Sequence, residues 1–189
     1  WPLLLYPVHI LFLELIIDPA CSVVFEAETE EDSIMTRKPR NPSRPMFGKR
    51  MLTLSILQGI SVLAIILIVY RLGLNRNLGE EHTRAMAFAA LIVANLALIF
   101  TNRSWTRTSF AMLQAPNRAL WWVMGGAAFF LAVVLYVPYL SELFRFSRPH
   151  PGDIAISLVA GLVGVAWFEV LKLSTGRRLR RRRQSARAV

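Results

Sequence analysis

Two carboxylates stand inside an apolar stretch near the N-terminus, where charged side chains are rare. Glu14 and Asp18 lie within residues 3–25, a block long enough to cross a membrane as a helix. They are four residues apart, so a helix projects both from nearly the same face, about one turn apart. Two neighbouring anions resist burial unless a cation binds between them or one carries a proton. The pair therefore favours a cation site that exchanges ions with protons.

A proline directly follows the second carboxylate. Pro19 has no N–H and crowds the preceding turn, so the carbonyl of Leu15 loses its helical partner and we expect a helix break. A free carbonyl at membrane depth is tolerated where it faces protein or a water-filled cavity, and it is a good ligand for a hard cation. Asn95, near the middle of another apolar block, can add a neutral oxygen at comparable depth.

The elements that position these residues are long apolar blocks. The chain has 189 residues, of which 54% are hydrophobic and only 18% charged, whereas a soluble chain has about 25% charged residues. We expect an all-α, polytopic transmembrane bundle of five helices within residues 1–173, followed by a basic tail at 174–189. The expected spans are residues 3–25, 51–71, 85–102, 119–140 and 154–173.

The basic residues predict an orientation for this bundle. The segments 26–50, 102–118 and 171–189 hold 17 of the 22 Lys and Arg residues, and the alternate connectors hold 5. By the positive-inside rule the N-terminus is outside and the C-terminus cytoplasmic. The net charge of +10 then indicates membrane lipid as a partner, with anionic lipid at the Arg-rich tail, and no nucleic acid.

Structural roles remain open for several of the same residues. Glu14 or Asp18 can pair with an Arg or Lys in a bridge between helices, and Asn95 can serve as an interhelical hydrogen-bonding group. His9 is expected at the membrane interface, as an interfacial residue rather than a metal ligand. Two small-residue sites, Gly125-Gly126 and the pair Gly161 and Gly164, are expected to be contacts between helices.

The first fifty residues resemble one family. Residues 7–18, PVHILFLELIID, resemble the sixth membrane helix of type II P-type cation-transporting ATPases, where an L-x-x-[ND/E]-L-x-x-D stretch supplies ion ligands. Residues 25–28, FEAE, and 32–42, DSIMTRKPRNP, resemble that family's cytoplasmic loop before the seventh helix. The span that begins at Arg84 resembles the eighth helix, and the last two spans match the ninth and tenth by hydropathy.

This resemblance implies roles for individual residues. Glu14 and Asp18 would be the metal-ion ligands, Asn95 an auxiliary ligand, and Ile17 a position whose backbone carbonyl binds the ion. Calcium pumps of the family usually have Asn at position 14, Thr at 17, Gly at 19 and Glu at 95. The Glu-then-Asp pair is more similar to the potassium-counter-transporting branch. The transported cation is therefore open among K⁺, Ca²⁺, Na⁺ and H⁺.

Motifs that the family needs for ATP hydrolysis do not occur in this sequence. Neither the phosphorylation motif D-K-T-G nor the G-D-G-x-N-D hinge is found. We expect no cofactor within the chain and no ATPase activity of the chain alone; ATP and Mg²⁺ would act in a parent pump. The partners would be helices one to five of that pump and its cytoplasmic domains.

We therefore interpret the chain, which begins Trp1-Pro2, as a piece of a longer P-type cation translocase. It would be a multi-pass protein of a bacterial plasma membrane that contributes part of an intramembrane cation site. Two alternatives remain: a self-standing multi-span protein with an assembly role, in which the acids form structural bridges, and a proton-coupled secondary carrier that uses the same two carboxylates.

Overall fold

The computed structural model describes residues 2–28, 48–103 and 117–185, and every element in these ranges is a helix. Five helical segments within them are long and apolar enough to cross a membrane. The prediction of an all-α bundle with five spans is confirmed. These segments are Pro7–Glu26, Met51–Asn75, Glu80–Asn102, Arg118–Tyr136 and Pro151–Leu171.

The first span is not a single regular helix. It consists of α1 (Pro7–Phe12), a π-helical turn η1 (Leu13–Ile17) and α2 (Asp18–Glu26). The other elements are α3 (Lys49–Asn75), α4 (Glu80–Asn102), α6 (Arg118–Tyr136), α7 (Pro138–Leu143) and α8 (Pro151–Ser185).

Some helix ends differ from the expected ones. Helix α6 ends at Tyr136, whereas the expected span runs to residue 140, because Val137 precedes Pro138 and adopts an extended backbone with φ −78° and ψ 118°. Pro138 then begins the short α7, a position where its missing N–H costs nothing. Helix α8 continues through the basic segment to Ser185, well past the expected end of its span.

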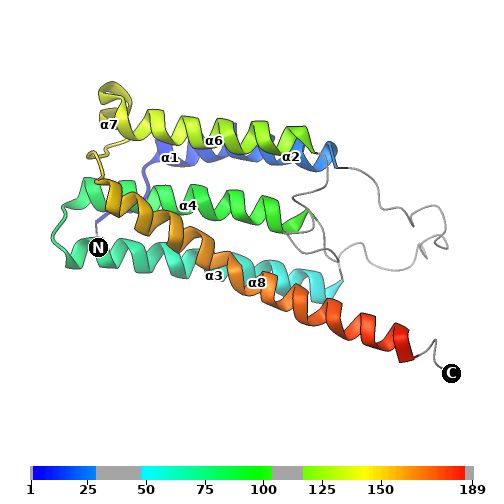
Figure 1. Cartoon of the computed structure of the whole chain (residues 1–189). Helices are drawn as coiled ribbons and strands as arrows, with labels where there is room; N and C mark the ends of the chain where they lie inside the picture. The colour runs from blue at the N-terminus through cyan, green and yellow to red at the C-terminus, as the bar shows by residue number, and fades with distance from the viewer. Residues whose placement is uncertain (1, 29–47, 104–116, 186–189) are drawn as a thin grey trace.

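Helix α4 is the centre of the bundle. About 61% of the most apolar stretch of α4 is buried inside the protein, against 22–28% of the corresponding stretch in each of the other spans. Figure 1 shows α4 between a layer of α1, α2 and α6 on one side and α3 and α8 on the other. Successive spans run in opposite directions, so the N-terminus and the C-terminus lie at opposite ends (Figure 1). We call the end with the α3–α4 connection and α7 the turn end, and the opposite end the tail end.

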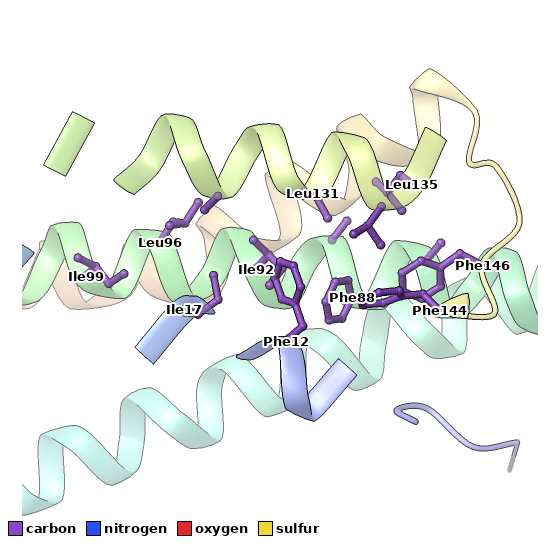
Figure 2. Close-up of a cluster of buried hydrophobic side chains, with 14 of the residues drawn as sticks. Phe12, Ile17, Phe88, Ile92, Leu96, Ile99, Leu131, Leu135, Phe144 and Phe146 are labelled. Carbon is purple, nitrogen blue, oxygen red and sulfur yellow. The ribbon is translucent and has the colours of Figure 1, made fainter. Parts of the chain in front are cut away.

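Two apolar clusters cover opposite faces of α4. The larger joins α4 to the first span and to α6, with Phe12 and Ile17 packed toward Phe88 and Ile92 of α4 (Figure 2). The second joins α4 to α3 and α8 through residues such as Tyr70 and Val165. Because lipid tails are as apolar as these side chains, such packing must be tight to hold helices together in a bilayer.

Small residues allow the closest helix approach. A Cβ added at Gly161 of α8 would lie 2.7 Å from the carbonyl oxygen of Ala90 in α4, and one at Gly164 would lie 3.3 Å from Ile65 of α3. The expected contact at these two glycines is confirmed. The expectation for Gly125-Gly126 is wrong for the described residues, because a Cβ at either position meets no atom within 4 Å. Helix α6 contacts α4 and α2 through another face.

We predict that Gly161→Val lowers the stability of the bundle. The new side chain would overlap the α4 backbone, and overpacking of this kind costs about 1–3 kcal/mol of unfolding free energy. The midpoint temperature of unfolding in detergent measures the loss. Gly125→Val is the matched control, because it makes the same change in a helix with open space around it. Equal midpoints for the two variants would contradict the close contact.

Candidate cation site

Glu14 and Asp18 lie near the middle of the first span, on its uncovered side. The face that packs against α4 and α6 carries Phe12, Ile17 and Val24, which are 6%, 2% and 0% exposed. Glu14 and Asp18 are both exposed. The two carboxylates therefore share the side of the helix that the rest of this chain leaves open.

The π-helical turn explains which residues of this span are buried. Phe12 and Ile17 are five residues apart, a spacing that turns side chains about 140° away from each other in a regular α-helix. In η1 the N–H of Asp18 bonds to the carbonyl of Leu13, five residues back, so the turn is wider and both side chains reach the core. The irregular turn ends at Ile17, directly before Asp18 and Pro19, and contains Leu15.

Neither carboxylate has a partner among the residues that the structure describes. No described Arg or Lys forms an ion pair with Glu14 or Asp18; within this region, Ser22 Oγ bonds only the backbone carbonyl of Asp18, at 3.4 Å. Asn95 is half-buried on α4, and the described hydrogen bonds do not involve it. The structure thus brings Glu14 and Asp18 to one face, while no hydrogen bond among the described residues joins Asn95 to either of them.

A buried arginine holds the start of this span at the turn end. Arg84 of α4 is 2% exposed. Its Nε donates to the carbonyl of Leu3 at 3.1 Å, and its Nη1 donates to the carbonyl of Arg145 at 2.9 Å. The guanidinium also lies 4.6 Å from the centre of the Tyr6 ring, a cation–π contact. Arg84 therefore joins α4, the segment before α1 and the segment after α7.

His9 lies at the same end, inside the protein. It is 0% exposed, and its ring stacks on Phe146 with a centroid distance of 4.9 Å. Its Nδ1 accepts from the N–H of Tyr6 at 2.8 Å, so Nε2 carries the proton and donates to the carbonyl of Phe144 at 2.9 Å. The expectation of an interfacial position is wrong, because both ring nitrogens are used within the core.

A second buried arginine holds the other end of the span. Arg103, directly after α4, donates from Nε and Nη2 to the two carboxylate oxygens of Glu28, at 2.6 and 3.0 Å. The side-chain amide of Asn117 donates to Glu28 at 3.0 Å and to the carbonyl of Val24 at 3.2 Å. The oxygen of the same amide caps α6 by accepting from the N–H of Leu120 at 3.0 Å. This group fixes the ends of α2, α4 and α6 together.

Nothing in the sequence marks these two arginines as buried. Each stands at an end of an apolar block, a position that is typical of side chains reaching into the lipid headgroups, and that pattern gives no sign of burial. Residues 32–42, which resemble the family's cytoplasmic loop, lie outside the described ranges.

Comparison with known proteins decides the family. Residues 2–174 match the family described as "Cation transporting ATPase, C-terminus". The chain belongs to this family. It is a C-terminal membrane domain of a P-type cation ATPase, which confirms the resemblance seen in the sequence.

Several bacterial relatives cover most of this ATPase domain. It is 29% identical to a calcium-transporting ATPase of Bacillus subtilis over 171 residues, which is 88% of the chain, and 28% identical to one of Listeria monocytogenes over 87% of the chain. A probable cation-transporting ATPase F of Mycobacterium tuberculosis is 25% identical over 79% of the chain. The alignments cover 18%, 18% and 16% of these relatives. The chain thus spans less than a fifth of their length.

We predict strong energetic coupling between Glu28 and Arg103. Removing one partner of a buried ion pair leaves an uncompensated charge and costs about 3 kcal/mol or more, so Glu28→Gln and Arg103→Leu should each be strongly destabilising. The double variant should be less destabilised than the sum of the two, with a coupling energy of at least about 1 kcal/mol. Denaturant titration in mixed micelles measures the free energy of unfolding. Additive effects would contradict the pairing.

Proposed function

We propose that this ATPase domain supplies part of the intramembrane cation site of a complete P-type pump. Glu14 and Asp18 are the charged ligands, Asn95 is an auxiliary ligand, and the carbonyls of Leu15 and Ile17, next to Pro19, complete the contribution of this chain. The observation that carries the proposal is the position of the two carboxylates at mid-span on an uncovered helix face.

Charge is costly in lipid. A carboxylate facing hydrocarbon at mid-membrane depth costs about 2.5–3.5 kcal/mol or more, and the uncovered face of the first span carries two. The neighbours of these carboxylates on that face, including Ile10 and Leu15, are 50% and 66% exposed. An apolar face with two acids requires helices that cover it and a positive charge that neutralises it. In the pump, helices one to five supply the cover and the transported cation supplies the charge.

The π-helical turn supports the same site. Pro19 has no N–H to offer the carbonyls of the preceding turn, and π turns occur often at functional sites. Oxygen ligands of this kind suit hard cations such as K⁺, Na⁺ and Ca²⁺. The two alternatives from the sequence are less well supported. An assembly role needs bridged acids, and no described residue bridges either carboxylate; an independent carrier fits poorly with the family.

We further propose that the turn end lies outside and that the tail end lies in the cytoplasm. The segments at the tail end hold 17 of the 22 Lys and Arg residues, which is the distribution that the positive-inside rule associates with the cytoplasm. The Arg-rich continuation of α8 would then lie at the cytoplasmic leaflet, where basic residues are attracted to anionic lipid. ATP and Mg²⁺ would act in the cytoplasmic domains of the parent.

We predict that Glu14→Gln and Asp18→Asn weaken cation binding by the whole pump. Each removes a ligand charge, and the cation concentration for half-maximal ATP hydrolysis should rise at least about tenfold, equivalent to about 1.4 kcal/mol. A panel of K⁺, Na⁺ and Ca²⁺ identifies the ion. Glu26→Gln changes an exposed acid at the end of the same helix and is the control. It should change the cation concentration for half-maximal ATP hydrolysis less than about twofold. Unaltered cation dependence in both site variants, at normal membrane abundance, would refute the assignment.

We predict opposite accessibility for the two ends of the bundle. In a pump whose native cysteines are replaced by Ser, a cysteine at Ser147, which is exposed at the turn end, should react with a membrane-impermeant maleimide in intact cells. A cysteine at Val189 should react only after the cells are permeabilised. The reverse pattern would overturn the orientation.

A further inference from the structure

A cluster of two histidines and one aspartate at the turn end is separate from the candidate cation site. His82 lies in the first turn of α4, Asp153 in the first turn of α8, and His150 immediately before α8. One ligand atom from each lies within 4.8 Å of the other two. We propose that these three residues form a binding site for a transition-metal dication, Zn²⁺ in the first instance, which links the start of α8 to the start of α4.

The distances suit one ion. His82 Nε2 is 2.8 Å from Asp153 Oδ2, and His150 Nδ1 is 3.8 Å from the same oxygen. Zinc binds imidazole nitrogen and carboxylate oxygen at about 2.0–2.2 Å, so two ligands of a tetrahedral ion are about 3.4 Å apart. The observed separations lie on either side of that value. A small rotation of the His150 ring, which is 83% exposed in its side chain, brings its nitrogen to the ion.

The backbone at this site is held in place. The carbonyl of His150 accepts from the N–H groups of Asp153 and Ile154, at 3.0 and 3.1 Å, so His150 caps the start of α8. Helices α4 and α8 are in close contact further along, at Gly161 and Ala90. The ligands therefore come from two helices whose separation is already set, and an ion would stabilise an existing arrangement.

The donor set distinguishes this ion from the transported one. Imidazole nitrogen suits zinc, copper and nickel, whereas K⁺, Na⁺ and Ca²⁺ prefer oxygen. Three protein ligands leave one position for water, since His150 borders solvent. Arg76 is 4.0 Å from the second oxygen of Asp153, and it opposes a cation there while orienting the carboxylate. The cluster is then a structural or regulatory site, and it does not depend on the proposed function of Glu14 and Asp18.

The test uses the whole pump, purified through a tag without histidine and treated with a chelator. Zn²⁺ titration followed by metal analysis should show one more equivalent bound by the wild type than by His150→Asn, which removes an exposed ligand without disturbing the core. The zinc affinity of this site should fall by at least about 100-fold, since even substitutions behind the ligands cost about 10–100-fold. Glu81→Gln, an exposed acid beside His82 on α4, should retain the full stoichiometry.

Two further measurements decide the outcome. Bound Co²⁺ should give the visible absorption of a four-coordinate site in the wild type and lose it in His150→Asn, and His150→Cys should restore zinc binding, because thiolate is also a zinc ligand. Equal zinc stoichiometry in wild type and His150→Asn would overturn the proposal, as would binding that His150→Cys does not restore. Transport activity enters none of these measurements, so failure of this site leaves the assignment of Glu14 and Asp18 standing.

Discussion

Helices in a bilayer gain little from contact between apolar side chains, because lipid offers them an equally apolar environment. The bundle depends on how α4 meets that constraint. Along its length it approaches α8 closely enough for the α4 backbone to touch Gly161. At its two ends Arg84 and Arg103 form buried hydrogen bonds with other segments. Close packing in the middle and charged hydrogen bonds at the ends replace the hydrophobic force of a soluble core.

The two arginines hold the first span at its ends, so one face of its middle can stay uncovered. Arg84 binds the carbonyl of Leu3, before the span begins, and Arg103 binds Glu28, just after it ends. The helix that carries the two acids is therefore held at both ends by α4, while its middle is held only on one side. The proposed ion site there can change its surroundings on the open side without releasing the helix.

Much of the fold could be predicted from the sequence, because its main determinant is the length of uncharged blocks. Five spans followed from that length alone. The predicted end of α6 was too late, although Pro138 stands in the sequence, because apolar residues continue on both sides of this proline. The burial of Arg84, Arg103 and His9 could not be predicted, because a polar residue at the end of a span has the same sequence pattern whether it faces headgroups or protein. For the candidate site, the shared face of Glu14 and Asp18 followed from their spacing, but their surroundings in a pump would come from the proposed cover by helices one to five.

The wide turn at Leu13–Ile17 accommodates one residue more than a regular helix would over the same rise. Loss of a single residue from that turn would return the segment to regular winding, and Phe12 and Ile17 would then be four residues apart, about 40° from each other around the helix. Ile17 and Val24 would keep their places in the core, and Glu28 would still face Arg103. The extra residue therefore does not serve the packed side of this span. A chain without it would keep the same packing and would lose only the widened backbone beside Glu14 and Asp18.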